Sequence, residues 1–204
     1  RVALLLKALE DSTIARNELS STQVQFLQSH RDKSLRERAA QLLGATPRKT
    51  ERQGLVEEFM PALKLKGDAA QGKAIYLERC SSCHRLGGDG HALGPDLASV
   101  RSSGPETILI NLLDPNLQVA PNYMSYIVET KDGESWLGLV ANETAASVTV
   151  RQANDIETVI LRANIQRMQS QGQSVMPEGL EAGLTAQGLA DLLQYITTAE
   201  EPKK

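Results

Sequence analysis

RCSSCHRL, residues 79–86, contains both cysteines of the chain. Cys80 and Cys83 are separated by two residues, and His84 follows the second cysteine directly. This spacing is compatible with a structural zinc site, with a redox-active dithiol or with covalent attachment of a haem group. Each of the three interpretations requires different partner residues, so the rest of the sequence has to distinguish them.

The composition sets limits on the fold and on the partners. The chain has 204 residues, enough for one large domain or two small ones. Its 41% hydrophobic and 23% charged residues are typical of a soluble globular protein. Aromatic residues make up only 3%, so the core must be mostly aliphatic, and a large prosthetic group would help to fill it. The net charge is −3 with both signs interspersed, so we expect no nucleic-acid partner.

The N-terminal sequence contains no membrane-spanning signal. The apolar run at residues 2–6 is interrupted by Lys7 and is too short for a span or for a signal sequence. We therefore expect that the chain is not an integral membrane protein. It begins with Arg rather than Met, which suggests a processed protein or a part of a longer one. The missing signal sequence then says nothing about export.

Residues 1–66 are predicted to be helical. One helix should begin after Asp32, with an apolar stripe formed by Leu35, Ala39, Leu42 and Leu43. Short helices with single apolar stripes resemble HEAT-type solenoid repeats, which bury their faces by stacking on neighbouring repeats. A plain helical extension that packs on the next domain would give the same pattern.

Residues 67–121 have a different character. Asp68 and Gln71 form a capping-box pattern at the start of a helix that should run into Cys80. A glycine-rich loop follows it. Pro105 suits the first turn of another helix, whose predicted apolar face consists of Ile108, Leu109, Leu112 and Leu113.

Residues 122–169 are predicted to form β-strands. Alternating apolar residues, an Asp-Gly turn at 132–133 and an Asn-Asp turn at 154–155 indicate two hairpins. Four or five such strands would make a small curled sheet. Residues 170–204 are predicted to return to helix, with Thr185 as the cap of an amphipathic closing helix.

Zinc and redox chemistry both fit the cysteine motif poorly. A structural zinc needs four ligands, and Cys80 and Cys83 supply two. His84 is adjacent to Cys83, and neighbouring side chains rarely bind the same small ion. If His91 were the third ligand, the only histidine left for the fourth position would be the distant His30. A redox dithiol normally opens a helix, whereas here a helix is predicted to precede the first cysteine. A disulfide would close a very small loop and add little stability.

Haem attachment requires two thiols and an adjacent histidine, and the motif supplies them. Residues 68–84 resemble the opening helix of class I cytochromes c, and 94–97 (GPDL) resemble the loop beneath their proximal histidine. Residues 174–179 (SVMPEG) resemble their distal methionine loop. His84 and Met176 are far apart for a compact cytochrome, but omitting the predicted strands restores an ordinary spacing.

The pattern as a whole resembles the planctomycete-type haem-binding domain, a cytochrome c family with a β insertion. The resemblance covers roughly residues 67–200, and its most specific motifs lie at 114–116, 122–123, 132–133 and 176–179. It implies a mainly α protein, with a class I cytochrome c fold at 67–204 and a small β-sheet insertion at 122–169. In that family, HEAT-like repeats and a sugar-dehydrogenase-like propeller often precede this domain. The helical segment 1–66 would then correspond to the repeats, whereas this sequence shows no propeller.

The resemblance also implies the roles of individual residues around one covalent haem c. Cys80 and Cys83 would form the thioether bonds, and His84 and Met176 would ligate the iron. The second ring nitrogen of His84 would donate to the carbonyl of Pro95.

The sixth ligand and a further predicted haem contact, Arg101, both have alternatives. Met124 is the rival for the sixth coordination position, although a methionine on a strand is more often a core residue. Arg101 is expected beside the haem propionates, but exposed arginines are common and need no such role.

The leading functional hypothesis is an electron-transfer module that takes electrons from an attached or docked dehydrogenase and is not itself an enzyme. The alternative is a haem enzyme or ligand sensor with a displaceable sixth ligand. A third hypothesis is a binding module without haem, in which the cysteines form a disulfide. Covalent haem attachment implies a periplasmic or other extracytoplasmic location. The sequence does not indicate an oligomeric state.

Overall fold

The computed structural model describes residues 2–11, 13–14, 19, 21–28, 30–43 and 51–200. The chain forms two compact units, Arg1–Glu51 and Arg52–Lys204. Among the described residues, no helix combines the length and the apolar character that crossing a bilayer requires.

The first unit contains helices α1 (Val2–Glu10), α2 (Ser21–Gln28) and α3 (Lys33–Leu43). Asp32 caps α3 as predicted, because its carboxylate accepts the N–H of Ser34 at 2.9 Å. The three helices share a small aliphatic core of Leu6, Leu27, Ala39 and Leu43. The likeness to HEAT repeats remains a prediction.

Helix α4 (Glu51–Phe59), from Arg52 onward, and the short 3₁₀ helix η2 (Met60–Lys64) belong to the second unit. Their apolar side chains pack against its core; they are Leu55, Val56, Phe59, Met60 and Leu63. We expected the N-terminal helical segment to extend to residue 66. The structure instead divides the chain at 51/52, because α4 and η2 bury their apolar faces on the helices that follow them.

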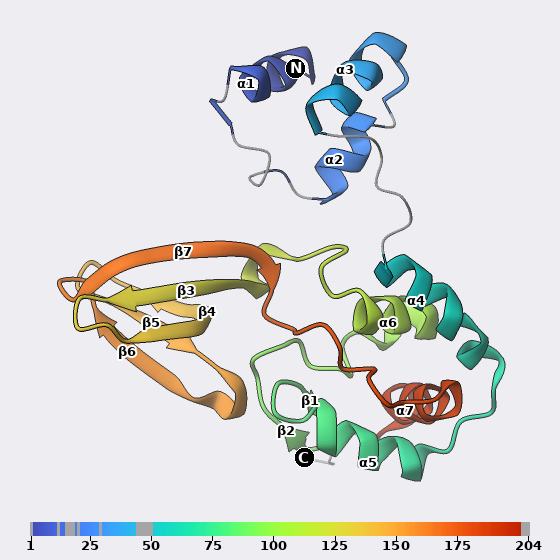
Figure 1. Ribbon diagram of the computed structural model, residues 1–204. Helices are drawn as coiled ribbons and strands as arrows, with labels where there is room; N and C mark the ends of the chain where they lie inside the picture. The colour runs from blue at the N-terminus through green and yellow to red at the C-terminus, as the bar shows by residue number, and fades with distance from the viewer. Residues whose placement is uncertain are drawn as a thin grey trace. The chain divides into compact units, whose positions relative to one another are not determined.

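The second unit has a helical part and a sheet, which Figure 1 shows on opposite sides. The helical part is built from α4, α5 (Ala69–Arg79), α6 (Gly104–Leu113) and α7 (Ala186–Thr198) around one core. Thr185 caps α7 as predicted, accepting the N–H of Gly188 at 3.1 Å. The predicted apolar face of α6 is buried, and α7 buries an apolar stripe of its own; the residues are Ile108, Leu109, Leu112 and Leu113 on α6, and Leu189, Leu192, Leu193 and Ile196 on α7.

Helices α5 and α7 cross in close contact at Gly72. A Cβ atom at this position would lie 1.9 Å from the carbonyl oxygen of Asp191, so no side chain fits there. The same crossing changes the cap that the sequence predicts for α5. Asp68 does accept the N–H of Ala70, at 2.8 Å, but its own N–H donates to the carboxylate of Asp191 at 2.8 Å. Asp191 therefore takes the place that the capping box assigned to Gln71.

The insertion is a five-stranded antiparallel sheet with the order β6-β5-β4-β3-β7. Its strands are β3 (Met124–Thr130), β4 (Ser135–Glu143), β5 (Ser147–Arg151), β6 (Glu157–Leu161) and β7 (Ile165–Ser174). Both predicted hairpins are present, with turns at 132–133 and at the 3₁₀ helix η5 (Ala153–Asp155). One face buries an aliphatic core of Val128, Val148, Val150 and Ile160.

Strand β7 extends beyond residue 169, where the sequence predicted the strands to end. Residues 170–174 are mostly polar and exposed, so no apolar alternation marks them as a strand. They are held by backbone pairing with β3, in which Met124 lies opposite Ser174. The first and last residues of the insertion are therefore neighbours, next to the 3₁₀ helix η4 (Pro121–Tyr123).

Short elements complete the second unit. Strands β1 (Arg85–Leu86) and β2 (Asp89–Gly90) form a small hairpin after the cysteine motif, and the 3₁₀ helix η3 (Arg101–Ser103) leads into α6.

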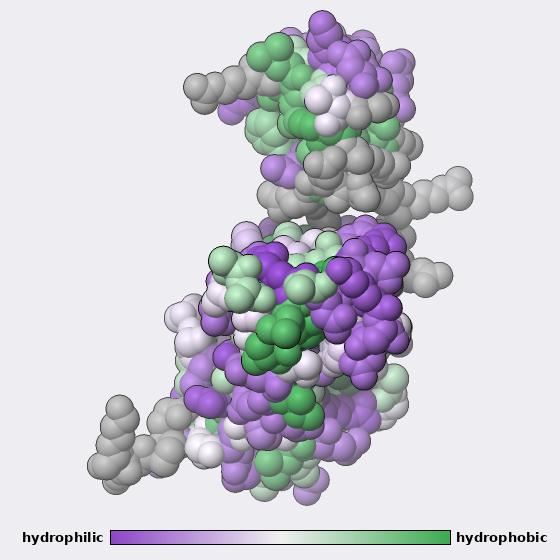
Figure 2. All heavy atoms as spheres, turned by 90° about the vertical axis from the view of Figure 1, so that its left-hand side faces the viewer, coloured by the Kyte–Doolittle hydropathy of each residue, from purple (hydrophilic) through white to green (hydrophobic). Residues whose placement is uncertain are grey.

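On the face that Figure 2 shows, apolar areas of the surface are separated by hydrophilic side chains.

Candidate functional site

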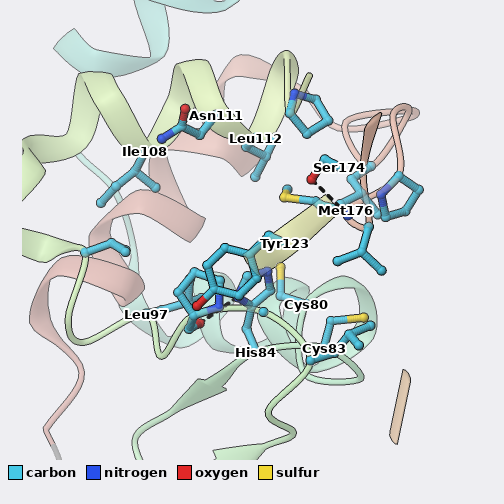
Figure 3. A pocket seen from close by; sticks show the side chains of 18 of the residues that line it. Cys80, Cys83, His84, Leu97, Ile108, Asn111, Leu112, Tyr123, Ser174 and Met176 are labelled. Atoms are coloured by element: carbon cyan, nitrogen blue, oxygen red, sulfur yellow. Dashed lines mark hydrogen bonds between the residues drawn. The ribbon is translucent and has the colours of Figure 1, made fainter. Parts of the chain in front are cut away.

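A cavity of about 310 Å³ lies in the second unit, between the end of α5, the loop 93–100, α6 and the segment that follows β7. Its wall is mostly apolar and includes Leu93, Leu97, Ile108, Leu112, Val119 and Ile196. Figure 3 shows the residues of the cysteine motif at one side of this cavity. An apolar cavity with a few polar groups is the usual form of a cofactor site.

Cys80 and Cys83 both line the cavity. Helix α5 ends at Cys80, and the N–H groups of Cys83 and His84 then donate to the Cys80 carbonyl at 3.0 and 2.8 Å. This tight turn presents both thiols and the imidazole to the same space. The two cysteines are free thiols rather than a disulfide.

The environment of Cys80 is unlike that of a redox cysteine. Its side chain is buried, and burial raises the pKa of the thiol to about 12. Reactive dithiols depend instead on a lowered pKa that stabilises the thiolate. The structure therefore gives no support to the redox interpretation of the motif.

The ring of His84 is held in one orientation. Its Nδ1 lies 2.8 Å from the carbonyl oxygen of Pro95, the bond that the family resemblance implies. A carbonyl can only accept, so Nδ1 carries the proton and Nε2 keeps its lone pair. Burial lowers the pKa of His84, although the hydrogen bond to Pro95 opposes this effect. The histidine is therefore a neutral ring with Nε2 available to a metal.

Gly94 allows the loop to pack against this ring. A Cβ atom on Gly94 would lie 2.4 Å from Cε1 of His84 and 2.7 Å from Nδ1. The N–H of Gly94 also donates to the carbonyl of Cys83 at 2.7 Å. The loop 93–97 therefore fixes both the backbone of the motif and the plane of the imidazole.

Tyr76 of α5 supports the motif from within the core. Its side chain is fully buried, and burial raises its pKa to about 12, so the hydroxyl stays protonated. The hydroxyl oxygen lies 2.8 Å from the carbonyl of His84 and 3.0 Å from that of Asp89. This contact joins the motif to the β1–β2 hairpin.

Met176 follows β7 and lines the cavity. Its N–H donates to the hydroxyl of Ser174 at 3.1 Å, and the N–H of Val175 donates to the carbonyl of Tyr123 at 2.9 Å. In Figure 3, Met176 and His84 lie on facing sides of the cavity. The rival methionine, Met124, begins β3 and is not among the residues that line the cavity.

The prediction that Arg101 lies beside the haem propionates remains untested, but the contacts of its side chain are clear. Arg101 is a described residue but does not line the cavity. Its guanidinium donates to the carbonyl oxygens of Ile196, at 2.7 Å, and of Ala199. These carbonyls lie at the C-terminal end of α7. The last carbonyl groups of a helix have no intrahelical partners, and this end of a helix favours a nearby positive charge.

Several residues around Met176 had no role assigned from the sequence. Asn116 accepts the N–H of Ser174 at 2.8 Å through its side-chain oxygen. Arg79, at the end of α5, donates to the carbonyls of Leu180 and Ala182 at 2.9 and 2.7 Å. Asn116 and Ser174 lie in motifs that carry the family resemblance, whereas nothing in the sequence marks Arg79 as a contact of this loop.

The β insertion contacts the cysteine motif directly. The turn between β5 and β6 places the N–H of Asn154 2.7 Å from the carbonyl of Ser82. The carboxylate of Asp155 accepts the N–H of Ala92 at 2.9 Å and lies 3.0 Å from Nδ1 of His91. These contacts lower the pKa of Asp155, the bond from Ala92 most of all. His91 is therefore engaged with the insertion.

The zinc interpretation gains no support from the structure. Within residues 51–200 and the described part of the first unit, no group of three or more His, Cys, Asp or Glu side chains could hold a metal ion. The two thiols and His84 alone do not make a tetrahedral site.

The comparison with protein families agrees with this geometry. Residues 69–116, from the start of α5 through the cysteine motif to the end of α6 and Asn116, match the family model of cytochrome c. The chain contains a cytochrome c domain. A search of curated proteins found no match to the chain.

The cytochrome c domain is suited to a c-type haem by its donor set. Two thiols, one neutral imidazole with a free Nε2 and one thioether border a single apolar cavity. Gly94 also lines this cavity, and a side chain at its position would collide with the His84 ring. The cytochrome c family thus accounts for a set of residues that the zinc and dithiol interpretations leave unexplained.

Proposed function

We propose that the second unit is an electron-transfer module with one covalent haem c. In this proposal Cys80 and Cys83 form the two thioether bonds, while His84 and Met176 provide the axial ligands. The observation that carries the proposal is that the imidazole of His84 and the thioether of Met176 border one apolar cavity together with both thiols. The bound haem would supply an iron that changes oxidation state by one electron.

The protein's own residues would set the properties of that iron. Pro95 holds Nδ1 of His84 and so keeps Nε2 as the ligating atom. Met176 contributes a soft, neutral sulfur, which favours the reduced metal and raises the reduction potential. With both axial positions filled by protein ligands, the module would pass electrons rather than bind a substrate.

The wider assignments form part of the same proposal. An electron carrier needs a donor, and we propose a dehydrogenase that is fused to this chain or docks on it. Covalent haem attachment takes place outside the bacterial cytoplasmic membrane, so we propose a periplasmic or other extracytoplasmic location. The likeness to the planctomycete-type domain is part of this proposal, and the five-stranded insertion between α6 and Met176 supports it. The HEAT-like character of the helices in front is proposed from the sequence alone.

The test is to express the chain in a host that matures c-type cytochromes. We expect the mass to increase by that of one haem. We also expect a ferric protein with the weak near-infrared band of sulfur-to-iron charge transfer, and a ferrous protein that binds carbon monoxide slowly. A chain that gains no haem mass contradicts the proposal, whereas fast carbon monoxide binding favours the ligand-sensor alternative.

A further inference from the structure

The loop that follows Met176 contains a buried carboxylate paired with an arginine of α4. Glu181 is only 9% exposed, and its Oε1 lies 2.6 Å from Nη1 of Arg52. Nε of the same guanidinium lies 3.1 Å from Oε2 of Glu178. One arginine therefore binds two carboxylates of a single loop.

The pairing matters because, among the described residues, Arg52 is the partner found for the carboxylate of Glu181. Its second oxygen, Oε2, is buried and has no hydrogen-bond partner among the described residues. A buried carboxylate that loses its cation leaves an uncompensated charge, which is strongly unfavourable. Loss of Arg52 should therefore make the buried position of Glu181 less favourable.

A chain of hydrogen bonds leads from this arginine to the methionine. Glu178, which Arg52 binds, accepts from the side-chain amide of Asn116 at 2.6 Å. Asn116 in turn accepts the N–H of Ser174 at 2.8 Å, and the hydroxyl of Ser174 accepts the N–H of Met176 at 3.1 Å. Figure 3 marks the last of these bonds. The backbone of Met176 is thus tied, step by step, to α4.

We infer that Arg52 is a positioning residue for the sulfur of Met176. It acts through Glu178 and Glu181, and it holds the loop so that the thioether stays at the cavity. This inference rests on the proposed function, because it concerns the proposed sixth ligand. Arg52 does not line the cavity, and it lies before residues 69–116, the part of the chain that matches the cytochrome c family model. It would therefore affect the ligation by Met176 only indirectly, by positioning the loop.

The structure contains what is needed to test this role. Arg79 holds the same loop from α5 through the carbonyls of Leu180 and Ala182. The loop should therefore stay folded without Arg52 but exchange more readily between a methionine-bound and a methionine-free arrangement. Arg151, paired with Glu157 on the sheet at 2.7 Å, offers a matched arginine–carboxylate pair away from the cavity.

The experiment compares the haem-loaded wild-type protein with R52Q, R52K, E181Q and the control R151Q. The readouts are the temperature at which the near-infrared sulfur band disappears, the temperature of global unfolding, and the rate of carbon monoxide binding to the ferrous protein. We expect R52Q to lose the band well below its unfolding temperature and to bind carbon monoxide about tenfold faster, the change that corresponds to roughly 1.4 kcal/mol. R52K should lie between R52Q and wild type, because lysine keeps the charge but cannot bridge both carboxylates.

The outcomes separate this inference from the proposed function. If the wild-type protein lacks the band, ligation by Met176 fails and the inference fails with it. If the wild type has the band, and R52Q and E181Q lose it only on global unfolding with an unchanged carbon monoxide rate, Arg52 is merely structural and the proposed function stands. Should R52Q not fold, R52K and E181Q decide the question by the same readouts.

Discussion

The backbone N–H of Asn154 donates to the carbonyl of Ser82 over 2.7 Å, which fastens a turn of the β insertion to the loop between the two cysteines. Asn154 and the following Asp155 have φ angles of 60° and 55°, a left-handed conformation that Asn and Asp tolerate better than most residues. The turn presents the carboxylate of Asp155 to the N–H of Ala92. The insertion therefore supports the cysteine motif as well as extending from the domain.

This contact predicts a pH-dependent contribution of Asp155 to stability. The hydrogen bonds of its carboxylate hold its folded-state pKa below the ordinary value of 3.8. The stabilisation is therefore complete above pH 3.8 and is lost as the pH falls through the lower folded-state pKa. We expect D155N to melt at a lower temperature than wild type at neutral pH, with a difference that disappears in strong acid.

Hydrogen exchange at the Ala92 amide gives a local measurement of the same contact. The exchange should accelerate in D155N. It should stay unchanged in D132N, since the pKa of Asp132 is also lowered, but by a hydrogen bond from Thr130 at the other end of the sheet. Equal effects of the two variants on Ala92 would contradict the assignment.

The contact between Gly94 and His84 predicts that even a methyl group is too large at this position. A Cβ there would lie 2.4 Å from Cε1 of the ring, so the ring or the loop must move. We expect G94A to lower the free energy of unfolding by about 1–3 kcal/mol, as overpacking usually does, and to shift the haem spectrum. Chemical denaturation and absorption spectra measure both effects.

Gly54 of α4 is the matched control for this substitution. A Cβ atom there meets nothing within 4 Å. Because alanine is the better helix former, G54A should raise the stability by roughly 0.5–1 kcal/mol and leave the spectrum unchanged. If G94A behaved like G54A, the packing of Gly94 on the imidazole would not be what positions the ring.

The two candidate methionines are expected to respond differently to removal. Met176 lines the cavity, whereas Met124 lies at the start of β3 opposite Ser174. M176A should abolish the near-infrared sulfur band and lower the reduction potential, because a thioether ligand favours the reduced iron. M124A should retain the band. Loss of the band in M124A alone would exchange the roles of the two residues.

Arg101 allows a test between its expected place beside the propionates and its observed place at the end of α7. Its guanidinium donates to the carbonyls of Ile196 and Ala199. Removing these charge-assisted bonds in R101Q should cost about 1–3 kcal/mol of unfolding free energy and leave the reduction potential unchanged. A potential that shifts with no loss of stability would instead support the propionate role.

Local signals in the sequence predicted most of the second unit's elements. Asp68 and Thr185 begin helices as expected, since a capping side chain acts within three residues of itself. The Asp-Gly turn at 132–133 could be predicted for the same reason, because it depends only on the two strands that it joins. The cysteine motif and the cytochrome c domain could be identified for the same reason, because their residues are close together in the chain.

Contacts between distant parts of the chain could not be predicted in this way. Arg52 and Glu181 are brought together only by the folded core, and neither has a neighbour in sequence that indicates the pairing. The end of β7 is defined by its partner β3 rather than by its own polar residues. Helix α4 has the same short apolar stripe as the helices before it, and only its packing assigns it to the second unit.

The pairing of Met124 with Ser174 also affects how the domain tolerates change in length. Since the insertion leaves and rejoins the domain at neighbouring positions on adjacent strands, the gap that it bridges is a single inter-strand distance, about 5 Å. Longer or shorter hairpins between Met124 and Ser174 would change how far the sheet extends from the domain. The distance between these two residues, and so the positions of the cavity residues on either side of the insertion, would stay the same. The sheet could therefore change in length without redesign of the cavity, provided that the turn at 153–155 kept its contacts with Ser82 and Ala92.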